Sequence, residues 1–166
     1  VYKRQAMSSD GQRFRHPHSL VWDEQQAERA EEALGLGMLL TERFEENANK
    51  LTKPVDDNVI KLYVAAQMSP KAVTIDHKKR QAEVDEGLLT RNHHRVMDLV
   101  KTSPGASLKS SEGTLWGALN SVTYFYDHEY GNTTDSRMTS AWFGANRIKK
   151  QRAWESALEF ADKIAA

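Results

Sequence analysis

The sequence predicts an all-α protein, a bundle of about five helices with one short strand expected at its N-terminal end. Apolar residues recur every three or four positions over most of the 166 residues, which is the spacing of one helix face. Proline, glycine and serine interrupt this pattern between the periodic stretches, as loops do. The chain has no cysteine, which excludes a disulfide framework and any cysteine-based metal site.

The first helix is expected over residues 23–51 and is the longest. Asp23 is its expected N-cap, and Gln26 follows three residues later in the spacing of a capping box. Gly35 and Gly37 lower its helix propensity, and their small size would allow another helix to approach closely. A second helix is expected from Asp56 or Asp57 to Met68, and a loop over 69–79 follows it. A third helix is expected over 80–102, with Val84, Leu88, Val96, Leu99 and Val100 in the core, and it is followed by a linker over 103–113. A fourth helix is expected over 114–130, and a last helix begins near Ser136 and either continues to Ile164 or restarts before Lys149.

The first five residues, VYKRQ, are what results when GTG-TAT-AAG-AGA-CAG, the end of a widely used transposon-based sequencing adapter, is translated. We therefore interpret residues 1–5 as a library scar rather than a genuine basic terminus, and exclude them from the fold. On this interpretation the chain is the C-terminal part of a longer protein. Residues 6–19 are then an irregular or strand remnant of the missing region, with the strand in QRFRH, and residues 20–166 form the helical domain.

Charge is unevenly distributed along the chain, although the net charge is zero. Residues 23–50 carry eight acidic and three basic side chains, whereas residues 136–154 carry five basic side chains and no acidic one. Two solvated helix faces would explain this difference. The alternative is a polar surface field that attracts phosphate or docks subunits head to tail.

The expected helix over 114–130 has Thr114 as its N-cap, is followed by Gly131 at a C′ position, and carries two contrasting sides. One side presents Leu115, Ala118, Leu119, Val122, Phe125 and Tyr126, and the opposite side presents Trp116, Asn120, Thr123, Tyr124 and Asp127. A surface helix should carry charge on its second side, so this helix either is buried on both sides or uses the second as a binding surface. If Asn120 or Asp127 is buried, we expect Arg137 or backbone N–H groups as its hydrogen-bond partner.

The segment SAWFGANRIKKQRAW, residues 140–154, interleaves aromatic and basic side chains. Aromatic rings that stack on bases and cations that follow the phosphates are the ingredients of single-strand binding, although an ordinary amphipathic helix contains them too. The candidate nucleic-acid contacts are Arg137, Trp142, Arg147, Lys149, Lys150 and Arg152.

No spacing in the sequence points to catalysis or to a bound metal. The residues of DHE, 127–129, would project about 100° apart on a helix, so they cannot chelate one ion together, and His93 and His94 fail in the same way. A pair formed by His16 and His18 would need a third ligand. We therefore expect no cofactor, no metal site and no catalytic residue in this chain. No apolar run approaches the roughly 20 residues of a membrane helix, so no membrane partner is expected.

Four strings carry a family resemblance. RFRHPHS, EQQAERAEEALGLG, GTLWGALNSVTYFYDHEYG and SAWFGANRIKKQRAWESAL resemble, in this order, the C-terminal half of domain-of-unknown-function family 932, the phage/plasmid-like proteins of tailed phages, prophages and plasmids. The resemblance runs from about Arg13 to Leu158, and Pro17 departs from it where the family usually has a hydroxyl residue. Its most specific side chains on the helix over 114–130 are Trp116, Asn120, Thr123, Tyr124, Asp127 and His128.

The resemblance implies a mobile-element protein located in the cytoplasm of a bacterial host, with genes of DNA replication and recombination as neighbours. We expect a non-enzymatic accessory protein of DNA metabolism that binds single-stranded DNA or takes part in recombination. One alternative is a helical assembly module that self-associates through residues 24–50 and contacts no nucleic acid. A second is an enzyme whose catalytic residues lie in a missing N-terminal half.

Overall fold

The computed structural model describes residues 5–7, 13–15, 24–76, 81–131 and 133–165. Within these residues the chain divides into two compact units, Val1–Asn47 and Ala48–Ala166. Helices dominate both units, and the strands are short, so the all-α expectation is confirmed. Residues 1–4 of the expected scar lie outside the described residues, as do Asp23 and the histidines at positions 16 and 18.

The first unit contains a two-stranded antiparallel hairpin and most of a long helix. Strand β2 (Arg13–Arg15) falls within the expected QRFRH strand, and it pairs with β1 (Gln5–Met7), which the sequence did not predict. Helix α1 (Glu24–Leu51) matches the expected long helix. Gly35 is exposed in α1, and a Cβ built there would meet no atom within 4 Å.

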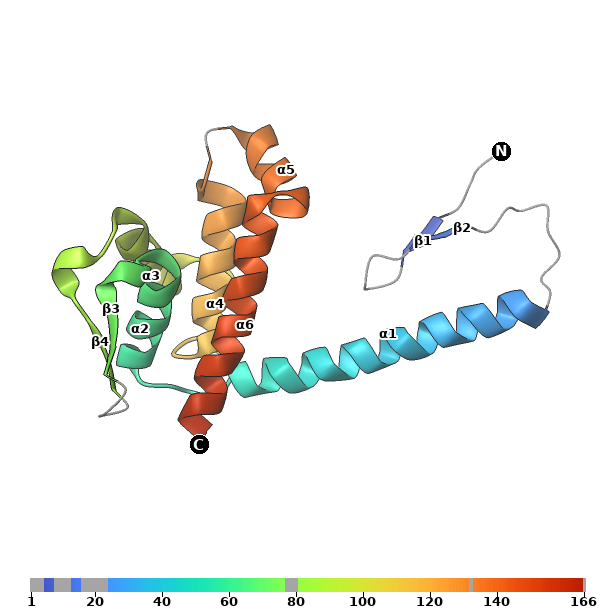
Figure 1. The fold of residues 1–166 in the computed structure, drawn as a ribbon, viewed down its shortest axis with the longest axis horizontal. Coiled ribbons are helices and arrows are strands. Elements are labelled where there is room, and N and C mark those ends of the chain that lie inside the picture. Colours follow the sequence, from blue (N-terminus) through green and yellow to red (C-terminus); the bar gives the residue numbers. More distant parts are fainter. Residues whose placement is uncertain (1–4, 8–12, 16–23, 77–80, 132, 166) are drawn as a thin grey trace. The chain divides into compact units, whose positions relative to one another are not determined.

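The second unit is a bundle built around a central helix, α4 (Leu115–Tyr124). Helices α2 (Asp57–Met68), α3 (Arg91–Thr102) and α6 (Ala145–Ala165) pack around α4, and α4 and α6 lie side by side along their lengths (Figure 1). The core of this bundle consists mainly of Leu51, Ile60, Tyr63, Val64, Met68, Val96, Leu99, Leu115, Leu119, Val122, Phe125, Ala153 and Ala157. All four helices contribute to it.

Hydroxyl and carboxyl caps fix where these helices begin. The Asp56 carboxylate accepts from the N–H of Asn58, and the Thr90 hydroxyl accepts from the N–H of His93. The Thr114 hydroxyl accepts from the N–H of Gly117, so the predicted N-cap is confirmed. Each cap satisfies a backbone donor that the first turn of a helix leaves unpaired.

Residues 69–90 differ from the expectation of a loop followed by a long third helix. A short 3₁₀ turn, η1 (Pro70–Ala72), leads into an antiparallel hairpin of β3 (Val73–Asp76) and β4 (Gln81–Val84), and α3 begins only at Arg91. Leu88, expected in the core, is 53% exposed in the 3₁₀ turn η2 (Glu86–Leu88). The pairing of β4 with β3 and the cap that Asp85 gives this turn take the place of the expected helix before Arg91.

The C-terminal part consists of two helices that meet at a corner. Helix α5 (Thr134–Phe143) begins with a capping box between Thr133 and Ser136, which agrees with the predicted start near Ser136. Gly144 ends it and α6 starts at Ala145, which is the predicted alternative of a helix that stops and restarts before Lys149. None of the helices in the described ranges has a stretch apolar enough, at sufficient length, to cross a membrane.

Candidate nucleic-acid interface

The site begins where α4 ends, because the helix widens there into a π-turn. Residues Phe125–Glu129 (η3) form one turn of π-helix directly after Tyr124. Turns of this kind push side chains out of the regular helical register and are frequent at functional sites. Gly131 closes the turn at the predicted C′ position with a φ of 131°, a backbone conformation that favours glycine.

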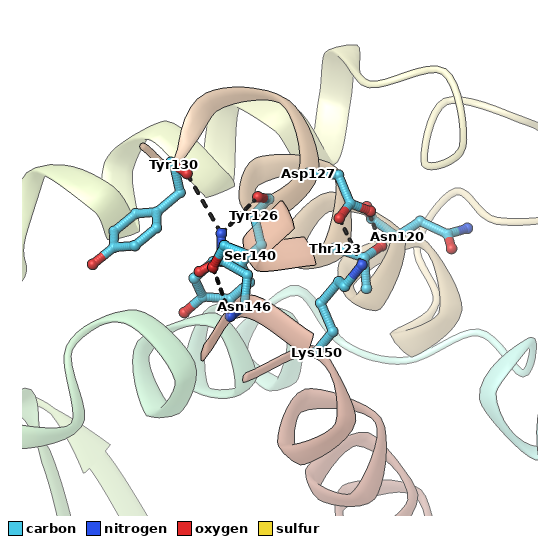
Figure 2. Close-up of polar contacts among 8 residues, drawn as sticks. All are labelled: Asn120, Thr123, Tyr126, Asp127, Tyr130, Ser140, Asn146 and Lys150. Atoms are coloured by element: carbon cyan, nitrogen blue, oxygen red, sulfur yellow. Dashed lines mark hydrogen bonds and ion pairs between the residues drawn. The ribbon is translucent and has the colours of Figure 1, made fainter. Parts of the chain in front are cut away.

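The first turns of α6 hold this π-turn in place, as Figure 2 shows for Asn146. The Asn146 side-chain amide donates to the carbonyl of Tyr126 at 3.1 Å and to that of Tyr130 at 3.5 Å, and the residue is only 3% exposed. Its backbone N–H donates to the Ser140 hydroxyl at 3.2 Å, which ties α5 to α6. The π-turn, α5 and α6 are therefore linked through one buried amide.

Lys149 adds a second contact between α6 and the π-turn. Its ammonium lies 4.2 Å from the ring centroid of Tyr130 and 5.3 Å from that of Tyr126, within the range of a cation–π interaction. Burial raises the pKa of the Tyr126 hydroxyl, with a smaller contribution from Tyr130, so this ring stays neutral beside the lysine. Lys149 is thus occupied by the protein's own aromatic rings.

Lys150 forms an ion pair with Asp127, and both side chains are partly buried. The Lys150 Nζ lies 2.6 Å from Asp127 Oδ1, with 23% and 34% of the respective side chains exposed (Figure 2). The sequence suggested Arg137 or a backbone N–H as the partner of Asp127, and that prediction is wrong. Arg137 instead donates to the Thr134 hydroxyl at 3.3 Å, within its own helix.

Both members of this ion pair line a cleft of about 710 Å³ between η3, α5 and α6. Two arginines, one lysine, one aspartate and an exposed tryptophan stand among the residues around it. The lining residues are Asp127, His128, Thr134, Arg137, Met138, Ala141, Trp142, Arg147 and Lys150. Three permanent cations therefore face one carboxylate, and the cleft favours an anionic ligand.

The cleft gathers residues that the sequence had placed in two separate sets. Four of the six candidate nucleic-acid contacts line it: Arg137, Trp142, Arg147 and Lys150. From the family-motif set, Asp127 and His128 line it too. The two remaining candidate contacts lie outside its lining: Lys149 packs on tyrosine rings, and Arg152 is exposed further along α6.

The other family-motif side chains have structural contacts on the second side of α4. Asn120 donates to the Gly105 carbonyl at 3.0 Å, rather than accepting from a backbone N–H as expected. Trp116 meets Trp154 edge to face at 6.1 Å, and the Tyr124 ring lies 4.4 Å from that of His128. The four residues on this side of α4, Trp116, Asn120, Thr123 and Tyr124, are all partly buried, so the helix packs on both sides.

Sequence reasoning missed Asn146, which organises the site, and Thr134 and Met138, which line the cleft. Asn146 lies next to the Gly144 corner, and an amide at the start of a helix is a weak signal for a contact with a distant carbonyl. Its acceptors lie 16 and 20 residues earlier in the chain, and only the folded structure brings them together.

Metal binding finds no support in the described part of the chain. No group of three or more histidine, aspartate or glutamate side chains in it is placed to hold a metal ion. Glu129 of the DHE string binds Arg95 through two hydrogen bonds of 2.6 and 2.7 Å, which lower the pKa of the Glu129 carboxyl. That pair joins α3 to the π-turn.

The fold and the cleft define a mainly helical protein with a cationic cleft at the corner between α5 and α6. The chain belongs to the family described as Domain of unknown function (DUF932), which matches residues 4–153. This match confirms the resemblance predicted from the four sequence strings. Neither the curated proteins nor the solved structures compared with the chain gave a match.

Proposed function

We propose that this protein is a phage- or plasmid-encoded accessory protein of DNA metabolism, and that it binds single-stranded DNA through the cleft between η3, α5 and α6. It acts without catalysing a reaction, and it works in the cytoplasm of the bacterial host. The observation that carries the proposal is the convergence of Arg137, Arg147 and Lys150 on a cleft that also contains Trp142. Phosphate groups and unpaired bases are the ligands that such a combination suits.

The exposure of the aromatic side chains supports a single strand rather than a duplex. Phe143 is 82% exposed and Trp142 is 67% exposed, more than any other large apolar side chain in the described ranges. Phe143 lines a separate hollow of about 640 Å³, whose lining shares no residue with the first. The exposed Trp142 ring in the cleft offers a stacking surface to an unpaired base, whereas the bases of a duplex are already stacked on one another.

Arg147 and Arg137 are suited to bind the phosphates. Arg147 is exposed in the first turns of α6, and Arg137 is held at its place in α5 by the Thr134 hydroxyl. A guanidinium presents a planar fork of donors that matches a phosphate, and it stays charged at any physiological pH. Lys150 contributes less net charge because Asp127 already pairs with it.

Fluorescence anisotropy of a labelled single-stranded oligonucleotide tests the proposal. Arg147→Gln and Trp142→Ala should each weaken binding about tenfold, since a stacked base or a phosphate contact contributes on that order. Lys163→Gln is the matched control, because it removes one exposed charge from the last turn of the same helix.

The control should bind as the unaltered protein does. Failure of the unaltered protein to bind any oligonucleotide at low salt would refute the proposal. An equal loss in the Lys163→Gln control would show that binding is not located at the cleft.

A second candidate function is self-assembly through α1, which exposed apolar side chains on that helix favour. Met38, Leu39, Leu40 and Phe44 are between 43% and 66% exposed. Contiguous exposed apolar side chains mark interaction surfaces in many proteins. Light scattering over a concentration series tests this candidate, and Leu40→Glu should shift an oligomer toward the monomer. A strict monomer at every concentration would rule it out.

A further inference from the structure

The geometry points to guanine as the base that the cleft selects: one unpaired guanine stacks on Trp142 and places its Watson–Crick edge against the Asp127–Lys150 pair. This inference rests on the proposed binding of single-stranded DNA, and it adds a base preference that strand binding alone does not require. The binding surface is the ion pair in the lining of the cleft, where both side chains are partly exposed.

The ion pair presents an ordered row of hydrogen-bonding groups. The Lys150 ammonium is a donor, and next to it the Asp127 carboxylate provides two acceptor oxygens. Asp127 Oδ1 accepts from Lys150 at 2.6 Å, but each carboxylate oxygen has a second lone pair that remains available. The row therefore runs donor, acceptor, acceptor.

Guanine is the base whose edge complements this row throughout. Its Watson–Crick edge runs acceptor, donor, donor, through the O6 carbonyl, the N1–H and the N2 amine. Thymine matches the first two positions but would place its O2 carbonyl against a carboxylate oxygen. Adenine and cytosine would place an amine against the lysine ammonium and a ring nitrogen lone pair against the carboxylate. A site built to accept hydrogen bonds discriminates strongly against partners that cannot donate them.

The cleft has room for a whole nucleotide beside this edge. Its volume of about 710 Å³ lies within the range of pockets that enclose ligands of that size. Trp142 supplies a ring on which the base can stack, and Arg137 and Arg147 line the same cleft to bind the flanking phosphate. The two arginines contribute affinity for any sequence, while the ion pair distinguishes the base.

The ion pair is held rigidly enough to act as a template. Asp127 lies on the π-turn that Asn146 fixes through the carbonyls of Tyr126 and Tyr130. Lys150 lies one turn after Asn146 on α6, so the same buried contact joins the two segments that carry the pair. Selective recognition requires such support, because a loosely held pair would adapt to any base edge.

The test compares oligonucleotides on the unaltered protein. A thymidine tract with a single central dG is titrated against the same tract with central dA, dC or deoxyinosine, which lacks only the N2 amine. We expect the dG tract to bind about tenfold more tightly than the dA and dC tracts, as one well-formed multidentate base contact allows. Deoxyinosine should lose part of that advantage. Excess dGMP should compete for the site only weakly, because it lacks the phosphates of the flanking strand.

Asp127→Asn provides the second measurement, since it keeps the shape of the side chain and replaces an acceptor with a donor. The variant should bind all tracts with similar affinity, and thermal melting checks that it folds. Equal affinity of the unaltered protein for all tracts would overturn the base preference while leaving strand binding intact. If dGMP competed as strongly as the dG tract, the inference of a base-selective strand site would be overturned in favour of a free-nucleotide site. Absence of binding to every tract would instead remove the proposed function itself.

Discussion

Asn146 on α6 donates its side-chain amide to the carbonyl of Tyr126 at 3.1 Å, across 20 residues of sequence. This bond joins the start of α6 to the π-turn that follows α4, and Asp127 is part of that turn. The family-motif helix and the basic C-terminal helix thereby become one site.

Asn146→Ala should therefore destabilise the protein. The substitution removes the side-chain donor from the buried Tyr126 carbonyl and from the partly buried Tyr130 carbonyl, at a cost of about 1–3 kcal/mol. Urea denaturation followed by circular dichroism measures the loss. Gln151→Ala is the control, because that exposed side chain donates to Glu155 on its own helix, and its loss should be small. Equal stability of both variants would contradict the role given to Asn146.

Gly131→Ala should reduce both stability and DNA binding. Gly131 has a φ of 131°, and a Cβ there would lie 2.8 Å from Cγ of Arg137, which must move. The backbone strain costs on the order of 1–3 kcal/mol, and the displaced arginine should weaken binding severalfold. Gly35→Ala serves as the comparison, since it lies exposed in α1 and the change should stabilise that helix by about 0.5–1 kcal/mol. A tolerated Gly131→Ala with full binding would show that Arg137 need not stay in place.

Tyr63→Phe tests how α2 is attached to α6. The fully buried Tyr63 hydroxyl donates to the Ala153 carbonyl at 3.0 Å, and burial raises the pKa of Tyr63 so that it remains a donor. Removal of the hydroxyl should cost about 1 kcal/mol, because the ring keeps its packing against Phe160. Tyr63→Ala should cost about 3 kcal/mol or more, since it also leaves a cavity. Chemical denaturation of both variants measures the two losses of stability. A larger loss for Tyr63→Phe than for Tyr63→Ala would contradict this packing.

His93 should make the bundle less stable in acid. It is 2% exposed on α3, and neither ring nitrogen has a hydrogen-bond partner among the described residues. Burial, with a smaller effect of His94, lowers the pKa of His93 below its ordinary value of 6.5, so the folded state favours the neutral ring. As the pH falls, the His93 imidazole takes up a proton in the unfolded chain before it does so in the folded protein. The stability that the buried neutral ring gives the fold is therefore complete above about pH 6.5 and is lost as the pH falls toward the lower folded pKa.

Thermal melting at about pH 8 and about pH 5 measures this effect. The melting temperature of the unaltered protein should fall between the two conditions, and His93→Leu should reduce that fall. His94→Gln, at an exposed neighbouring position, should keep most of it. Identical pH dependence in the unaltered protein and His93→Leu would assign the effect to other groups.

The sequence predicted the helices well where periodicity and caps agree. Thr114, the apolar side of α4 and the C′ glycine at position 131 all lie where local rules place them. The β3–β4 hairpin was missed because its strands have four residues each, too short for an alternating pattern to exceed the helical signal around them.

The candidate site was predicted in its residues but not in its assembly. The basic and aromatic side chains on α5 and α6 could be identified from composition, and the motif of α4 from the family resemblance. Which cation pairs with Asp127 depends on the π-turn, which shifts the helical register after Tyr124 and has no clear sequence signal. For that reason Arg137 was predicted as the partner, where the fold places Lys150 instead.

The salt dependence of single-strand binding tests the central claim most directly. Anisotropy titrations from about 50 to 200 mM salt should give an affinity that falls steeply for the unaltered protein, because phosphate binding releases counterions. The double variant Arg137→Gln, Arg147→Gln should have a logarithmic slope shallower by about 1.4, corresponding to two lost phosphate contacts on a single strand. An unaltered protein that binds no strand at the lowest salt, or a double variant whose slope is unchanged, would contradict the account.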